Sequence, residues 1–317
     1  MPSNSFSNVL VGVDVSKDWL DLCRHGTAEV ERIENTDDAI AAWIARSKPD
    51  LVAMEPTGGY ERKLCAVIAE AGVRYVKLHP NTILAFRKAR GVRAKTDRID
   101  ARLIAEHLAD AQARGVLPKI IPADERLRAL SARRRQLVDI LHAERCRADL
   151  ASEPSVRDSM TAIIAALAES LGAIETAIER HIAGDMALNR LAKTLRGVRG
   201  VGPVVAAILI ADLPELGRLT GKQIAALVGL APQTRDSGKT SWRAHTGHGR
   251  PMVRGALFNA ARAAIRHPSP MKDFYDRLVT NNRRPGKVAL CAVMRKIIVI
   301  ANAVARDELT RQTRELA

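Results

Sequence analysis

Four carboxylate residues have the types and positions needed for metal-dependent chemistry on phosphate esters. Asp14 lies near the end of an apolar run, Glu55 ends a second one, and Asp97 and Asp100 stand three residues apart in a basic stretch. The last two would share one face of a helix. Clustered carboxylates repel one another unless cations neutralise them, and their hard oxygens suit Mg²⁺ or Mn²⁺. Such ions can clamp the attacking and leaving oxygens of a phosphoryl transfer.

For any one of these acids, a solvated surface position is the simpler interpretation, because carboxylates are usually exposed. Asp14 differs because it follows Val-Leu-Val-Gly-Val, which is typical of a buried strand. A carboxylate at the end of such a strand is costly without a partner. Ligands of open α/β sheets also collect at the carboxyl ends of strands, where both Asp14 and Glu55 would lie.

A serine in a basic loop offers a nucleophile. Ser237 is followed by Gly238, and the cations around it can hold a phosphate. The predicted nucleic-acid contacts in this region are Arg235, Lys239, Arg243, Arg250 and Arg254. Serine attack on phosphorus would leave a covalent phosphoserine ester that conserves the bond energy for rejoining. Ser241 is a competitor for this role, and a plain Asp-Ser-Gly turn explains the same residues.

Two further segments carry possible phosphate contacts. The glycine-rich stretch 197–202, which contains Arg199, resembles a helix-hairpin-helix turn. Its glycines would let the backbone approach a phosphate, although such turns also serve helix packing. The other segment is a basic cluster around the two later aspartates: Arg87, Lys88, Arg90, Arg93, Lys95 and Arg98. We expect Arg93 and Lys95 of this cluster to contact nucleic acid.

The overall charge points to a polyanionic partner. The 317 residues include 50 Lys and Arg against 35 Asp and Glu, a net charge of +15, which favours nucleic acid. Aromatic residues make up only 3%, which argues against recognition mainly by base stacking. The four cysteines form no CxxC pair, the N-terminus lacks a signal-peptide core, and the longest apolar stretch contains Pro203. These features predict a cytoplasmic protein without membrane contact.

The elements that would position these residues fall into three predicted domains. Residues 8–115 alternate strands and helices, with strands near 8–15, 19–24, 28–33, 50–55 and 73–78, and this predicts an α/β domain. Residues 123–190 predict long helices with a break at Pro154. They form either an antiparallel hairpin or an oligomerising coiled coil, and the pattern alone does not decide between them. Residues 191–317 predict a mostly helical domain.

Taken together and in order, these motifs resemble those of a known family. The motifs are Gly12-Val-Asp14-Val-Ser-Lys17, Glu55-Pro-Thr-Gly-Gly-Tyr60, Lys95-Thr-Asp97-Arg-Ile-Asp100-Ala-Arg102, Arg199-Gly-Val-Gly-Pro203 and Arg235-Asp-Ser237-Gly-Lys239. Each motif is weak alone, but the ordered set, spanning about 8–306, is specific. It resembles the insertion-sequence transposases with a DEDD acidic set, also described as bridge-RNA-guided serine recombinases.

The resemblance implies an RNase H-like, RuvC-type N-terminal domain, a coiled-coil link and a C-terminal transposase domain. It implies that Asp14, Glu55, Asp97 and Asp100 bind Mg²⁺ or Mn²⁺ and that Ser237 is the covalent nucleophile. It also implies a non-coding guide RNA that pairs with donor and target DNA. The implied assembly is a dimer or tetramer, with the acidic site of one subunit completed by the serine of another.

Three hypotheses for function follow. The first is an RNA-guided, Mg²⁺-dependent DNA transposase that acts through phosphoserine. The second is a metal-dependent, structure-selective nuclease such as a junction resolvase, in which the acids activate water and Ser237 only binds phosphate. The third is a non-catalytic nucleic-acid-binding protein, whose affinity would fall steeply with salt.

Overall fold

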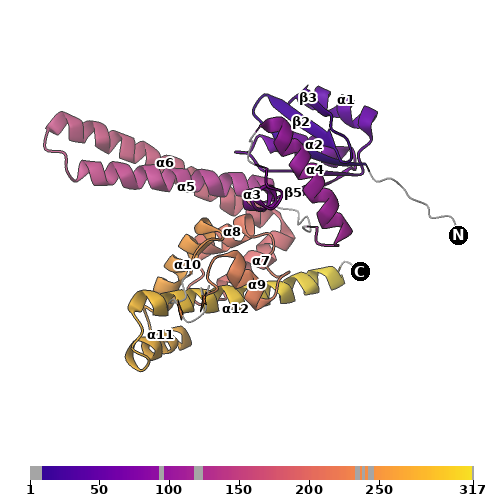
Figure 1. Ribbon diagram of the computed structural model, residues 1–317. Helices are drawn as coiled ribbons and strands as arrows, with labels where there is room; N and C mark the ends of the chain where they lie inside the picture. The colour runs from indigo at the N-terminus through magenta and orange to yellow at the C-terminus, as the bar shows by residue number, and fades with distance from the viewer. Residues whose placement is uncertain are drawn as a thin grey trace. The chain divides into compact units, whose positions relative to one another are not determined.

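The computed structural model describes residues 9–92, 96–117, 124–232 and 246–315, with the backbone of two short strands at 236–237 and 240–241. The chain divides into two compact units, residues 1–120 and 121–317, and each is taken by itself below (Figure 1). This division groups the long helices with the C-terminal helices. The finer three-domain division stays a prediction.

Unit 1 is built on a five-stranded sheet with the order β3-β2-β1-β4-β5. Its strands are β1 (Leu10–Val15), β2 (Trp19–Arg24), β3 (Val30–Glu34), β4 (Leu51–Met54) and β5 (Arg74–Lys77). β2 runs antiparallel to both β1 and β3, whereas β4 runs parallel to β1 and β5. This mixed sheet with its helices confirms the expected α/β class of the N-terminal domain. Its RNase H-like, RuvC-type identity stays a prediction.

Helices cover both faces of this sheet, which explains why β1 and β4 read as nearly continuous apolar runs. They are α1 (Asp37–Ser47), α2 (Glu61–Glu70), α3 (Pro80–Ala89) and α4 (Asp97–Ala113). Val11, Val13 and Val15 belong to the core that includes residues of α1 and α2. Leu10 belongs instead to the core shared with α3 and α4. Because side chains alternate along a strand, Asp14 shares the face of Leu10.

One glycine sets how closely α4 approaches the sheet. A Cβ atom at Gly12 would lie 2.2 Å from the amide nitrogen of Ala105 and 2.4 Å from the carbonyl oxygen of Ala101. Both contacts are with the backbone of α4, which cannot give way without moving the helix. Gly12 therefore lets α4 lie directly on β1, two residues before Asp14.

Unit 2 is mostly helical, as expected. Its helices are α5 (Glu125–Ala148), α6 (Pro154–Gly184), α7 (Met186–Arg196), α8 (Pro203–Asp212), α9 (Gly221–Leu227), α10 (Pro251–Ala264), α11 (Pro270–Thr280) and α12 (Gly286–Glu315). α5 and α6 run side by side as an antiparallel hairpin (Figure 1), and Arg134 pairs with Glu175 across it at 2.7 Å. The assignment of this hairpin as a coiled coil stays a prediction.

Two helices of unit 2 are long and apolar enough to cross a membrane by length and composition. α12 buries half of its apolar window inside the unit, as the central helix of a folded core does. α6 buries only 6% of its window, and it packs along α5, which carries Arg133, Arg134 and Arg135. A membrane interior would be a costly place for these guanidinium groups, so this pairing supports the expectation of no membrane contact.

Candidate active site

Carboxylates gather at the end of β1. Burial raises the pKa of Asp14, and neighbouring negative charges raise it further, to about 6. In order of decreasing effect, these charges are on Asp97, Asp21 and Glu55. The fold thus brings Asp14, Glu55 and Asp97 within electrostatic reach of one another, although they are far apart in the sequence. A carboxyl group that resists ionisation in this way would gain from a nearby cation.

Asp21 also belongs to this acidic cluster, although the sequence analysis did not predict it. Its Cα is the register partner of that of Asp14 across β1 and β2, and its side chain is nearly buried. Directly opposed residues of an antiparallel pair lie on the same face of the sheet. The signal was present in the sequence, since a lone acid interrupts the apolar strand 19–24.

Arg32 of β3 joins this acid to Asp97. Its guanidinium donates to both carboxylate oxygens of Asp21, with Nε–Oδ1 at 3.0 Å and Nη2–Oδ2 at 2.7 Å. The same Nη2 lies 3.2 Å from Oδ2 of Asp97. The arginine therefore offsets part of the negative charge and links β3 to the start of α4.

Asp97 and Asp100 both lie in the first turn of α4, as predicted, but they have different partners. Thr96 caps the helix by accepting a hydrogen bond from the amide of Ile99. The side chain of Asp97 is 64% exposed, whereas Asp100 is nearly buried and forms an ion pair with Arg87 of α3. In this structure Asp100 thus holds α3 against α4, and its role as a metal ligand stays a prediction.

Glu55 follows β4 and begins a turn that a buried acid organises. The carboxylate of Glu61 accepts hydrogen bonds from the amides of Thr57 and Gly59, at 3.2 and 3.1 Å. Lys77 lies 3.8 Å from the same carboxylate. Gly58 and Gly59 both have positive φ values, 61° and 98°, which glycine adopts without strain. Glu61 therefore fixes the loop that carries Glu55.

Asn35 connects the loops that follow β1 and β4. Its side-chain amide donates to the carbonyl oxygens of Ser16 at 3.0 Å, Lys17 at 3.4 Å and Tyr60 at 3.1 Å. The carbonyl of Asn35 itself accepts from Nζ of Lys63 at 3.1 Å. Asn35 is almost fully buried, so these bonds act as a brace between the segment after Asp14 and the segment after Glu55.

The donor chemistry of this cluster fits a hard divalent cation, because carboxylate oxygens are the ligands that Mg²⁺ and Mn²⁺ prefer. Within the described residues, no group of three or more His, Cys, Asp and Glu side chains already has a metal-binding arrangement. In this structure arginines hold the carboxylates of Asp97 and Asp100. A cation would have to compete with Arg32 for Asp97.

The predicted nucleophile lies in a loop whose two ends are packed together. Ser237 pairs with Thr240 and Asp236 with Ser241, so β6 (Asp236–Ser237) and β7 (Thr240–Ser241) form a tight hairpin. Cβ atoms added at Gly229 or Gly249 would lie 2.1 Å from the carbonyl oxygen of His248 and 2.5 Å from the amide nitrogen of Gly229, respectively. The loop that carries the serine hairpin therefore begins and ends at segments that pack closely together, and this packing requires glycine at positions 229 and 249. The side chain of Ser237 and residues Arg93, Lys95, Arg235, Lys239 and Arg243 lie outside the described residues.

The remaining predicted phosphate contacts have different surroundings. Arg250 binds Glu215 through two hydrogen bonds, at 2.6 and 2.5 Å, and donates to the carbonyl oxygen of Asp212 at 2.7 Å. Arg254 donates to the carbonyl oxygen of His248. These contacts give both arginines a structural task at the base of the serine loop. Arg199 is exposed. The nucleic-acid contacts of all three stay predictions.

The glycine-rich turn between α7 and α8 serves packing at one position and is open at another. A Cβ at Gly200, where φ is +89°, would lie 2.2 Å from the carbonyl oxygen of Ala260 in α10. At Gly202, the N-cap of α8, no atom lies within 4 Å of such a Cβ. Gly200 thus seats the turn on α10, while Gly202 leaves the first turn of α8 approachable. Its identity as a helix-hairpin-helix motif stays a prediction.

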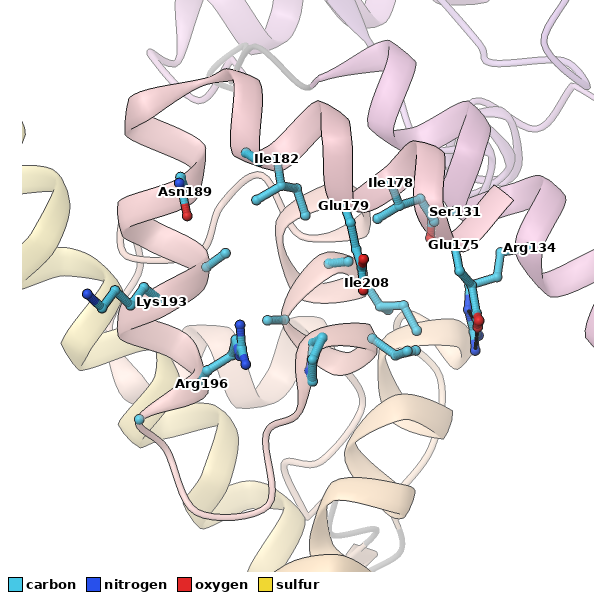
Figure 2. A pocket seen from close by; sticks show the side chains of 17 residues that line it. Ser131, Arg134, Glu175, Ile178, Glu179, Ile182, Asn189, Lys193, Arg196 and Ile208 are labelled. Carbon is cyan, nitrogen blue, oxygen red and sulfur yellow. Dashed lines mark hydrogen bonds and ion pairs between the residues drawn. The ribbon is translucent and has the colours of Figure 1, made fainter. Parts of the chain in front are cut away.

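A hollow of 880 Å³ lies beside this turn, between α5, α6, α7 and α8. Figure 2 shows Arg196 pointing into it, while Arg134 and Glu175 meet at its other end. Its lining mixes charged residues with apolar ones, which include Ile178, Ile182 and Ile208. Arg196 forms no ion pair with any of the described residues, so this rim offers a positive charge next to the predicted phosphate-binding turn.

Comparisons with known proteins agree on one family. A family model for DEDD transposases of IS110 elements, described as "Transposase", matches residues 11–150. A second model, "Transposase IS116/IS110/IS902 family", matches residues 192–276. The first contains the described acids, and the second contains the turn before α8 and the serine hairpin.

Named relatives agree with these models. The "Pilin gene-inverting protein" of Moraxella bovis is 25% identical over 313 residues, covering 95% of this chain and 97% of that protein. A "Probable family 20 transposase" of Pseudomonas aeruginosa is 29% identical over 127 residues, covering 39% of this chain and 36% of that protein.

A solved structure, Thermus thermophilus RuvC, is 16% identical to 35% of this chain and is itself covered to 99%, with a TM-score of 0.27, which is too low to establish a shared fold. The similarity to this family therefore rests on the sequence matches. This chain carries DEDD transposase domains of the IS110/IS116 family and has transposase homologues.

Proposed function

We propose that this protein cuts and rejoins DNA as a transposase, using the acidic cluster of unit 1 and Ser237 as the covalent nucleophile. The observation that chiefly supports the acidic site is the convergence of Asp14, Glu55 and Asp97, whose mutual repulsion helps raise the pKa of Asp14 to about 6. Such a convergence of acids is uncommon without a function and calls for a counter-charge.

In the proposed mechanism, Asp14, Glu55, Asp97 and Asp100 would hold Mg²⁺ or Mn²⁺. When bound, the cations would neutralise and polarise the scissile phosphate. The Ser237 hydroxyl attacks phosphorus, so that an Oγ–P bond forms and one bond from phosphorus to a deoxyribose oxygen breaks. The serine proton passes to the departing sugar oxygen. No water is consumed, and attack by a sugar hydroxyl on the phosphoserine reverses the step and rejoins DNA.

The partners of this reaction are donor and target DNA, and we propose that a non-coding RNA from the element selects them. The net charge of +15 supports polyanionic partners but does not distinguish RNA from DNA. We further propose that the active form is a homo-oligomer in the cytoplasm. Apolar side chains left exposed on the α5–α6 hairpin, including Ile140 and Ile163, support self-association.

A second candidate function is a metal-dependent nuclease in which the acids activate water and no protein–DNA bond forms. It is favoured by the clustering of carboxylates within unit 1, where Asp21 lies near the predicted acids and is held by Arg32. In that case Ser237 would only contact phosphate.

The deciding experiment compares Ser237→Ala with Ser241→Ala. Each variant is incubated with Mg²⁺, element-end DNA and RNA that co-purifies with the parent protein. Covalent protein–DNA adducts are then counted on denaturing gels. We expect Ser237→Ala to remove adducts completely while keeping DNA and RNA affinity, because a methyl group cannot attack phosphorus. Ser241→Ala, which changes the matched serine of the facing strand, should still form adducts.

Normal adducts from Ser237→Ala would exclude this serine from the mechanism. Cleavage by the parent protein into free ends, with no adduct and no effect of either serine change, would favour the nuclease. Loss of adducts in Ser241→Ala alone would move the nucleophile to position 241.

A further inference from the structure

We propose that Arg98 and Arg102 form a docking site for the phosphodiester backbone of DNA beside the acidic cluster. The inference rests on the proposed function, because it assigns the path by which DNA reaches that cluster. Arg98 belongs to the basic cluster identified in the sequence, and Arg102 follows it on the same helix.

The site is a hollow of 460 Å³ on the surface of unit 1. Arg98, Ile99 and Arg102 of α4 form one wall, and residues 28–31, at the start of β3, form the other. The two arginines are four residues apart and therefore lie on the same face of the helix. The volume falls in the range of ligand pockets, roughly 300–1,000 Å³, and is large enough for a backbone segment.

The two arginines are available for a ligand. Arg98 forms no hydrogen bond or ion pair with the rest of the described chain, and Arg102 has only a long contact of 3.8 Å to Glu106. Both are exposed. Arginine suits this role because its planar guanidinium can bind phosphate oxygens through two hydrogen bonds.

The other basic residues of the neighbouring cluster are used differently. Arg87 is committed to Asp100, and Arg90 lies over the ring of Phe86 and 3.8 Å from Glu106. The basic residues of this cluster, which look alike in the sequence, therefore have different partners in the structure. Among its described arginines, Arg98 is the member left free, and Arg102 joins it from one turn further along α4.

A cationic docking site is needed at this position for an electrostatic reason. Asp14, Asp21 and Asp97 repel a phosphate, and Arg32 already neutralises part of their charge. DNA that approached the acids alone would be driven away. Arg98 directly follows Asp97 in the first turn of α4, so a phosphate held in the hollow would place the next part of the strand beside the exposed carboxylate of Asp97.

Two acids line the opposite wall, and their partners decide the net charge of the site. Glu31 forms an ion pair with Arg46, which offsets its charge. Glu29 is exposed and forms no ion pair with the described residues. Two available arginines thus face one available glutamate, and the balance favours an anion. We expect Glu29→Gln to strengthen DNA binding.

The test measures binding of duplex DNA by fluorescence anisotropy in EDTA, from 50 to 200 mM salt, for the parent protein and for Arg98→Ala/Arg102→Ala. Each phosphate contact adds about 0.9 to the slope of log affinity against log salt, so losing two lowers it by about 1.8. The affinity advantage of the parent over the variant should then shrink roughly tenfold across this salt range.

The control is Arg74→Ala/Arg114→Ala, which removes the same charge from exposed positions of the same unit, together with the exposed Arg114–Asp110 ion pair. It should change the salt slope much less. Arg98→Lys/Arg102→Lys should restore the slope, because it keeps both charges. Thermal unfolding of the alanine pair should match that of the parent, since neither arginine anchors a neighbour.

The outcomes separate this inference from the proposed function. If the parent binds DNA and cleaves it, while the alanine pair keeps the parent's slope and affinity, the docking site is overturned and the function stands. An equal effect of the control pair would also overturn it, as would a loss confined to structured RNA. If the parent neither binds nor cleaves DNA, the proposed function itself fails.

Discussion

At the scale of single residues, the ionised carboxylate of Asp14 destabilises the folded state. Its pKa of about 6 lies above the ordinary 3.8, mainly because of burial and then because of the negative charges around it. Between these pH values the unfolded chain has already lost a proton that the folded chain keeps. Folding therefore becomes less favourable as pH rises through this window, and the cost is fully present above it.

We expect Asp14→Asn to raise the thermal unfolding temperature of the metal-free protein at pH 7, because the amide removes the buried charge. The difference from the parent should disappear below about pH 4, where Asp14 is protonated in both the folded and the unfolded chain. Adding Mg²⁺ should stabilise the parent but not the variant, since a ligand that binds only the folded state raises its stability. Differential scanning calorimetry measures all three effects.

Asp18→Asn is the matched control, because it changes an exposed aspartate in the loop between β1 and β2. It should leave both the pH dependence and the response to Mg²⁺ as in the parent. An Asp14→Asn protein that is less stable than the parent at pH 7, or that is stabilised equally by Mg²⁺, would contradict this account.

At the scale of elements, the acids depend on loops whose geometry is set by buried polar side chains. Asn35 bridges the loops after β1 and β4 through three carbonyl oxygens. Asn35→Ala should lower stability, because it removes part-buried hydrogen bonds that contribute about 0.5–1.5 kcal/mol each. It should also raise the concentration of Mn²⁺ needed for half-saturation in calorimetric titration, since Asp14 and Glu55 would no longer be held in register.

Asn302→Ala separates the two effects. Asn302 is equally buried in unit 2, where it donates to the carbonyl oxygen of Leu219 and accepts from the amide of Gly217, both at 2.8 Å. Its loss should destabilise the protein similarly but leave Mn²⁺ affinity unchanged. If Asn35→Ala also left Mn²⁺ affinity unchanged, Asn35 would be a structural residue only.

The elements themselves were readable from the sequence, whereas the pairing of their side chains was not. Apolar runs near 8–15 and 50–55 became β1 and β4, and Pro154 marks the start of α6, because periodicity and proline act locally. The partner of Asp100 is Arg87, and Asp14 faces Asp21, because the packing of α3 on α4 and the register of β1 on β2 decide these contacts. Such choices depend on tertiary packing, which a single sequence does not display.

At the scale of the whole molecule, the α5–α6 hairpin exposes large apolar side chains. α6 buries only 6% of its apolar window, and Ile140, Val156 and Ile163 are each more than 40% exposed. Burying a large aliphatic side chain contributes about 1.5–3 kcal/mol, so a second hairpin packed here would gain appreciably. This surface is where we place the proposed self-association.

Ile140→Glu/Ile163→Glu should therefore shift the protein toward monomer, because association would bury two new charges. Sedimentation velocity over a range of concentrations measures the change. Ala165→Glu is the control, since position 165 lies on the polar side of α6 with Asp158 and Glu169, and it should leave the association state unchanged. The family resemblance implies that the acids of one subunit act together with the serine of another. If so, the monomeric variant should bind DNA but form no covalent adduct. A monomeric parent would contradict self-association through this surface, and adduct formation by the monomeric variant would show that one chain suffices for the reaction.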